Sequence, residues 1–143
     1  MMENLKRQNI DYLIEEFWKN GYLTVSRKFG TYLPEPEKIG GFDVDIIAKQ
    51  GKDYALGITL TADDFKNPKL LEKVIFLATR HTRFTQKPVQ LYIGVPEEHL
   101  KLAKGLLDSL SKEIKTNIKL FKLMDKSLSR INHTRKFKKA PIS

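Results

Sequence analysis

The chain has 143 residues and no cysteine, and 41% of its residues are hydrophobic and 30% are charged. This length predicts a single domain, and the composition is typical of a globular protein. No apolar run reaches the roughly 18 residues that a membrane span requires, and the first residues lack the apolar core of a secretory signal. Because no cysteine is present to form disulfides, we expect a cytoplasmic protein that has no membrane partner.

The positive charge is concentrated at the C-terminal end. The chain has a net charge of +9, and residues 111–143 contain ten lysines and arginines but only two acidic residues, so this segment alone carries +8. We therefore expect a folded domain at 1–124 followed by a basic extension at 125–143. Such a distribution indicates a polyanionic partner, most often nucleic acid, and the alternative is a solubilising basic tail.

The first part of the chain predicts a helix, a strand and a loop. Residues 4–20 carry apolar side chains on one stripe of a helical wheel, and Gly21 follows where a helix usually stops. Residues 22–28 read as a strand. Residues 29–41 contain several glycines and prolines, which predict a loop.

A hairpin and a second helix come next. Residues 42–49 and 54–61 read as strands, and the short glycine-containing link between them predicts an antiparallel hairpin. The pair Asn67-Pro68 predicts the start of a helix that runs to Arg83, with asparagine as the N-cap and proline in the first turn.

Three further elements complete the order. Residues 89–95 read as a strand, residues 97–114 as a helix and residues 117–123 as a last strand. The order is therefore α-β-β-β-α-β-α-β. An α/β fold with a mixed sheet and helices on both faces is the economical packing of such a chain.

Two aspartates near the start of the hairpin are the most unusual residues. Alternation along residues 42–49 places Asp43 and Asp45 on one face of a strand, although strand interiors disfavour aspartate. Binding of a divalent metal is one reason for such a pair. The alternative is a solvent-facing edge, or a pair of carboxylates neutralised by lysine and arginine.

These features resemble the PD-(D/E)XK nucleases, and among them the archaeal Holliday junction resolvases. The resemblance covers residues 5–95 and depends on the element order and on the segment Asp45-Ile46-Ile47-Ala48. It implies a restriction-endonuclease-like αβββαβ core with an added helix and strand. It also implies that Asp45 and Asp43 are catalytic residues that hold Mg²⁺, that Asp11 in the first helix contributes another acid, and that the protein acts on DNA as a homodimer.

The chain departs from the family at its second motif. The family has Glu-x-Lys on the next strand, where the glutamate binds metal and the lysine positions the attacking water. Tyr54, Leu56, Ile58 and Leu60 indicate the core face of this strand, so the site would lie on the opposite face. On that face Gly57 replaces the glutamate and Thr59 replaces the lysine, and neither residue can perform these roles.

Two explanations follow from this departure. Catalysis is impaired or absent on a retained scaffold, or the missing groups come from elsewhere in the chain. The substitutes that the sequence offers are Asp63, Asp64 and Glu72 for the acid, and Lys28, Lys49 and Lys73 for the lysine.

A second group of residues is predicted to bind nucleic acid. Lys69, Lys73 and Arg80 fall within about 40° of one another on a helical wheel, and Arg83 follows them. Such a row could follow a phosphate backbone, as could the basic residues of the C-terminal extension. The residues of the extension that we expect to bind nucleic acid are Arg135, Lys136, Lys138 and Lys139.

The sequence therefore predicts a nucleic-acid-binding protein on a nuclease-like scaffold. The first alternative is a Mg²⁺-dependent DNA endonuclease with displaced catalytic residues. The second is a protein-interaction module whose basic end meets an acidic partner.

Overall fold

The structure, a computed structural model, describes residues 2–82 and 86–124, and it confirms an α/β fold with a mixed sheet. The five strands lie in chain order: β1 (Leu23–Arg27), β2 (Ile46–Gln50), β3 (Asp53–Thr59), β4 (Gln90–Pro96) and β5 (Ile118–Leu123). The pairs β1–β2 and β2–β3 are antiparallel, and β3–β4 and β4–β5 are parallel. The basic extension at 125–143 lies outside the described residues.

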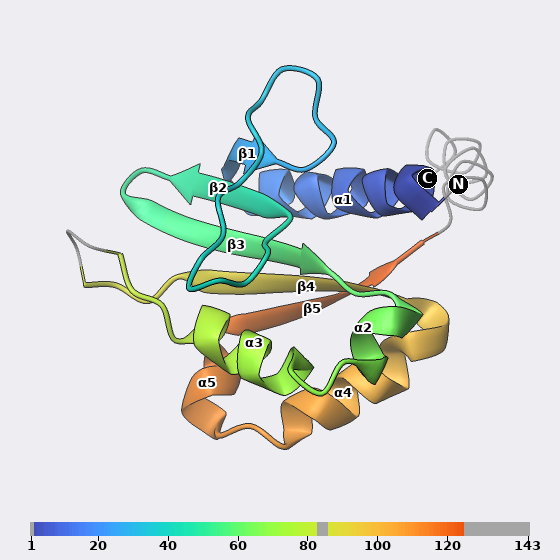
Figure 1. Cartoon of the computed structure of the whole chain (residues 1–143). Coiled ribbons are helices and arrows are strands. Elements are labelled where there is room, and N and C mark those ends of the chain that lie inside the picture. Colours follow the sequence, from blue (N-terminus) through green and yellow to red (C-terminus); the bar gives the residue numbers. More distant parts are fainter. Residues whose placement is uncertain (1, 83–85, 125–143) are drawn as a thin grey trace, which may run out of the picture.

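Helices cover both faces of this sheet (Figure 1). One long helix, α1 (Met2–Lys19), lies on one face, and the shorter helices lie on the other. These are α2 (Ala62–Lys66), α3 (Leu70–Ala78), the 3-10 turn η1 (Glu97–His99), α4 (Leu100–Asp108) and α5 (Lys112–Thr116). Within the described residues, no helix combines the length and the apolar character that crossing a membrane requires.

The first helix lies on the sheet through the stripe that the sequence predicts. Ile10, Leu13 and Phe17 are fully buried, and the Phe17 ring stacks on Tyr92 of β4 with centroids 4.1 Å apart. The helix ends before Gly21, whose φ of +86° is the left-handed conformation that glycine adopts readily. The predicted first helix is thus confirmed.

The hairpin has the predicted pairing and the predicted core face. Ile46 pairs with Gly57 and Gln50 with Asp53 across the turn. Leu56, Ile58 and Leu60 are buried in the cluster that packs against α3 and α4. Strand β2 begins only at Ile46, however, so the predicted strand at 42–49 is too long, and both Asp43 and Asp45 precede the strand.

The predicted helix at 67–83 is wrong in extent. The chain forms the short helix α2 before this segment, and Asn67 is the C-cap of α2 instead of an N-cap. Its side-chain Oδ1 accepts a hydrogen bond from Lys69 N at 2.9 Å, and α3 then begins at Leu70 and ends at Ala78. Asparagine favours this local turn because its side chain can bond to a backbone N–H two residues later.

The predicted helix at 97–114 is also wrong in extent, because the chain breaks near Ser111. It forms η1, α4 and α5 in turn, and the Ser111 side chain accepts from Ile114 N at the start of α5. Serine favours such a cap, which competes with a continuous helix.

Gly57 allows a close approach of α1 to the sheet. A Cβ at this position would lie 2.9 Å from Cε2 of Phe17 and 3.1 Å from Cβ of Ile46. The strand face that the resemblance assigns to catalysis is therefore filled by Phe17 of α1 at this point, and a side chain at residue 57 would force Phe17 or Ile46 to shift.

We expect Gly57→Ala to destabilise the protein by roughly 1–3 kcal/mol, because the added methyl overpacks the contact between α1 and β3. Gly105→Ala in α4 is the matched control, since nothing lies within 4 Å of its added Cβ. Alanine there should stabilise the helix by roughly 0.5–1 kcal/mol. Urea unfolding measures both effects, and equal values for the two variants would contradict the close packing at Gly57.

Candidate functional site

The carboxylate of Asp45 is the centre of the candidate site. Its Oδ2 accepts hydrogen bonds from Thr59 N at 2.7 Å and from Thr59 Oγ1 at 3.0 Å. The ammonium of Lys6 lies 3.1 Å from the same oxygen and donates to the backbone oxygen of Thr59 at 2.7 Å. The side chain of Asp45 is only 6% exposed, so this carboxylate is buried and already paired.

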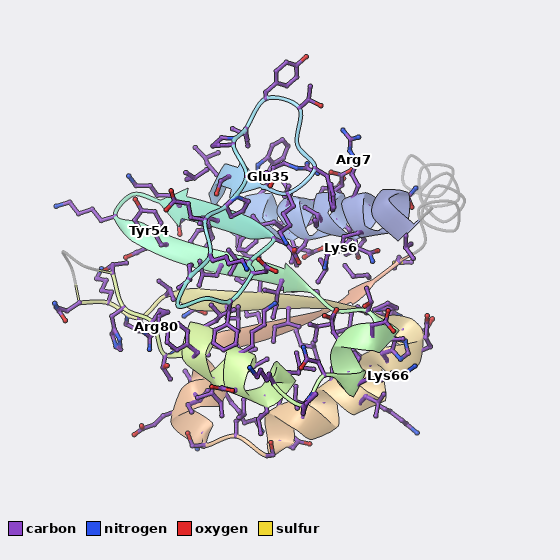
Figure 2. The ribbon with its side chains drawn as sticks, in the orientation of Figure 1. Lys6, Arg7, Glu35, Tyr54, Lys66 and Arg80 are labelled. Atoms are coloured by element: carbon purple, nitrogen blue, oxygen red, sulfur yellow. The ribbon has the colours of Figure 1, made fainter. Side chains whose placement is uncertain are left out.

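The sequence analysis missed Lys6. Figure 2 shows it on the side of α1 that faces the sheet, whereas Arg7 lies on the side of the loop that follows β1. A signal was present, because Lys6 precedes Ile10 by four residues and Leu13 by seven, which places it on the buried stripe of α1. A lysine on such a stripe needs an anionic partner at the sheet, and Asp45 provides it.

Asp43 and Asp45 do not share a strand face, which corrects the sequence interpretation. Asp43 lies in the loop before β2 and is 55% exposed. The two carboxylates nevertheless converge on one lysine, because Nζ of Lys28 lies 4.0 Å from an oxygen of each. Nζ of Lys38 also lies 4.0 Å from Asp43. The structure thus supports the alternative in which lysines neutralise the pair.

A cavity of about 240 Å³ adjoins these residues, and Asp43, Asp64, Lys69 and Lys73 are among those that line it. Burial lowers the pKa of Lys73, while the charges of Asp45, Asp64 and Asp43 partly oppose this effect and that of Lys6 adds to it. The structure therefore brings together three substitutes that the sequence offered, since Asp64 and Lys73 line this cavity and Lys28 lies 4.0 Å from Asp45. Asp64 also holds α2 in place, since its Oδ2 accepts from Thr61 N at 2.7 Å.

The other substitutes and the additional acid lie apart from Asp45. Asp11 forms an ion pair with Arg27 of β1, with 2.7 Å between Oδ1 and Nη2. Lys49 lies toward the other end of β2, with its Nζ 5.5 Å from the centre of the Tyr54 ring. Asp63 and Glu72 are exposed in the first turns of α2 and α3.

The predicted basic row on one helix is only partly present. Lys69 is exposed at the N-cap of α3, but Lys73 turns toward the aspartates and is half-buried. Arg80 follows the helix, with its guanidinium 3.8 Å above the Phe76 ring. The remaining residues predicted to bind nucleic acid lie outside the described ranges; they are Arg83, Arg135, Lys136, Lys138 and Lys139.

The arrangement around Asp45 does not suit a magnesium ion. Lys6 occupies Oδ2 of Asp45, and Gly57 leaves no room for the acidic side chain that the family uses as a second ligand. Across residues 2–82 and 86–124, no group of three or more histidine, aspartate and glutamate side chains is arranged to hold a metal ion. Asp45 instead acts as an acceptor that joins α1, β2 and β3.

Comparison of the chain with family models, with curated proteins and with solved structures finds no match.

We expect Asp45→Ala to destabilise the protein by roughly 2–4 kcal/mol, because it leaves Lys6 and the donors of Thr59 without their acceptor. Asp43→Ala is the matched control, and its effect should stay within about 0.5 kcal/mol because that side chain is more than half exposed. Chemical denaturation compares the two variants. Similar small losses for both would contradict a structural role of Asp45.

Lys73→Met should stabilise the protein at neutral pH, and this advantage should shrink as the pH rises toward 10.5. The sign follows because the folded state holds the Lys73 proton less tightly than the unfolded state, so deprotonation removes the cost of burying the charge. The exposed neighbour Lys69→Met should show no such trend. The free energies of unfolding of the wild type and the two variants between pH 7 and 10.5 measure this trend. A difference between Lys73→Met and the wild type that does not change with pH would contradict the prediction.

Proposed function

We propose that this chain is a nucleic-acid-binding protein on a nuclease-like α/β scaffold, and that its former catalytic position now stabilises the fold. The observation that carries this proposal is the buried pairing of Asp45 with Lys6 and Thr59. Because Lys6 and the two donors of Thr59 all contact Oδ2 of Asp45, a metal ion could bind this oxygen only by displacing Lys6. The element order α1-β1-β2-β3 followed by helices and a parallel strand supports the choice of scaffold.

The positive charge of the chain supports nucleic acid as the ligand, and we expect this nucleic acid to be DNA. Five lysines surround the three carboxylates of Asp43, Asp45 and Asp64, and they are Lys6, Lys28, Lys38, Lys69 and Lys73. This surface therefore keeps an excess of positive charge after every carboxylate is paired with one lysine. Lys38 and Lys69 are exposed, which leaves their ammonium groups accessible to phosphates. The net charge of +9 on the whole chain acts in the same direction.

A Mg²⁺-dependent endonuclease is the second candidate. It is favoured by the shared cavity of Asp43, Asp64 and Lys73, which places an acid and a lysine from other elements beside Asp45. Binding of a metal would require Lys6 to leave Oδ2 of Asp45. The homodimer that the resemblance implies stays a prediction.

Binding should be measured by fluorescence anisotropy with labelled duplex, single-stranded and four-way-junction DNA. We expect binding that persists in EDTA and weakens steeply as salt rises, because cations released from DNA drive association. Lys38→Glu/Lys69→Glu should raise the dissociation constant at least tenfold and flatten the salt dependence. Lys101→Glu/Lys104→Glu on the exposed face of α4 makes the same charge change and should have a smaller effect.

The same substrates, incubated with Mg²⁺ or Mn²⁺, test the enzyme. Metal-dependent cleavage that is lost in Asp64→Asn but kept in the exposed Asp63→Asn would overturn the proposal in favour of the endonuclease. No binding to any of the three substrates would also overturn it and would leave the protein-interaction module as the explanation of the charge.

A further inference from the structure

A cavity of about 840 Å³ lies away from Asp45, on the face of β2 and β3 opposite α1. Cross-strand pairing places Ile47 beside Leu56 and Lys49 beside Tyr54 on this face. Helix α3 covers the neighbouring strands but not this end of the hairpin (Figure 1). Ile47 and Tyr54 are consequently only half-buried, and they form an apolar floor that continues onto Val89.

Three cations line the same cavity, namely Lys49, Lys52 and Arg80. None of them forms an ion pair with a carboxylate in the part of the chain that the structure describes. The acid next to them in the hairpin, Asp53, lies 3.6 Å from the ammonium of Lys87. Covering this cavity with an uncharged ligand would bury positive charge without compensation, so the ligand should carry an anion.

Arg80 is fixed in a position suited to bind an anion. Its Nε donates to the backbone oxygen of Phe76 at 2.9 Å, and its guanidinium stacks 3.8 Å from the Phe76 ring centre. This anchoring leaves the two terminal nitrogens for a ligand and lowers the entropy lost on binding. Figure 2 shows Arg80 and Tyr54 at the same end of the molecule, one after α3 and the other on β3.

We propose that this cavity binds a nucleotide, with its base against Tyr54 and the apolar floor and its phosphate held by Lys49, Lys52 and Arg80. The volume lies within the range of about 300–1,000 Å³ that small-molecule sites have. A flat ring joined to a phosphate satisfies both halves of the cavity, because aromatic side chains stack on bases and arginine pairs with phosphate oxygens. The nucleotide comes either from solution or from an unpaired position in a strand, and only the second source rests on the proposed function.

Calorimetry of the full chain with adenosine monophosphate, adenosine and inorganic phosphate tests whether the cavity binds a base and a phosphate together. We expect the nucleotide to bind at least tenfold more tightly than either fragment. Lys52→Gln and Arg80→Gln should each weaken it severalfold, and Arg7→Gln, on the other side of α1, should not change it. Dodecanoate, an apolar anion without a ring, should compete poorly; tighter binding of dodecanoate than of the nucleotide would overturn the proposal.

Photocrosslinking with a single-stranded oligonucleotide that carries 5-iodouracil distinguishes the two sources. Crosslinks that map to β3 at Tyr54, and that are lost in Tyr54→Leu while the circular dichroism is unchanged, identify a nucleotide within a strand, even if the free nucleotide does not bind. No binding of the free nucleotide together with no crosslink at β3 would overturn the proposed site. The proposed function would still stand in that case if Lys38→Glu/Lys69→Glu weakens DNA binding, so the two failures are distinguishable.

Discussion

The carboxylate of Asp45 connects three elements that are far apart in the chain. It precedes β2, it accepts two hydrogen bonds from Thr59 at the end of β3, and it pairs with Lys6 in α1. Each interaction compensates for the burial of the others, because an isolated carboxylate or ammonium at this depth would be costly. This group of charges links α1 to the sheet at the candidate site, in addition to the apolar stripe of Ile10, Leu13 and Phe17.

The same packing fills the two positions, Gly57 and Thr59, at which the resembled nucleases carry their second motif. Phe17 approaches Gly57 so closely that no side chain fits at that position, and Thr59 uses its hydroxyl to bind Asp45. A nuclease of the family that the chain resembles needs an acid and a lysine at these two places, both accessible to metal and water. Here the two positions contribute to packing and to a buried polar interaction, which favours stability and excludes a ligand.

Charge is arranged differently around Asp43 and Asp64 than at the cavity on β2 and β3. Around Asp43 and Asp64 the lysines meet aspartates, so much of their charge is neutralised locally and the surplus is modest. At the turn end of the hairpin, Lys49, Lys52 and Arg80 line an apolar cavity without a described carboxylate partner. The first surface suits a long polyanion bound through many weak contacts, and the second suits one anionic group held beside a ring.

The sequence by itself determined the order of the strands, the hairpin and the core face of β3, because these depend on periods of two and 3.6 residues that are local. It did not indicate α2 or the break between α4 and α5. That Gly57 and Thr59 depart from a nuclease motif stays a prediction from the sequence. The sequence failed at the helix at 67–83, where the side chain of Asn67 closes a turn, and at Asp43, which lies in a loop and not on a strand face. Only the tertiary structure decided that α1 fills the face beside Gly57, that Lys6 neutralises Asp45, and that Asp64 and Lys73 line one cavity. These contacts join residues distant in sequence, so they follow from how the whole chain packs and leave little local signal.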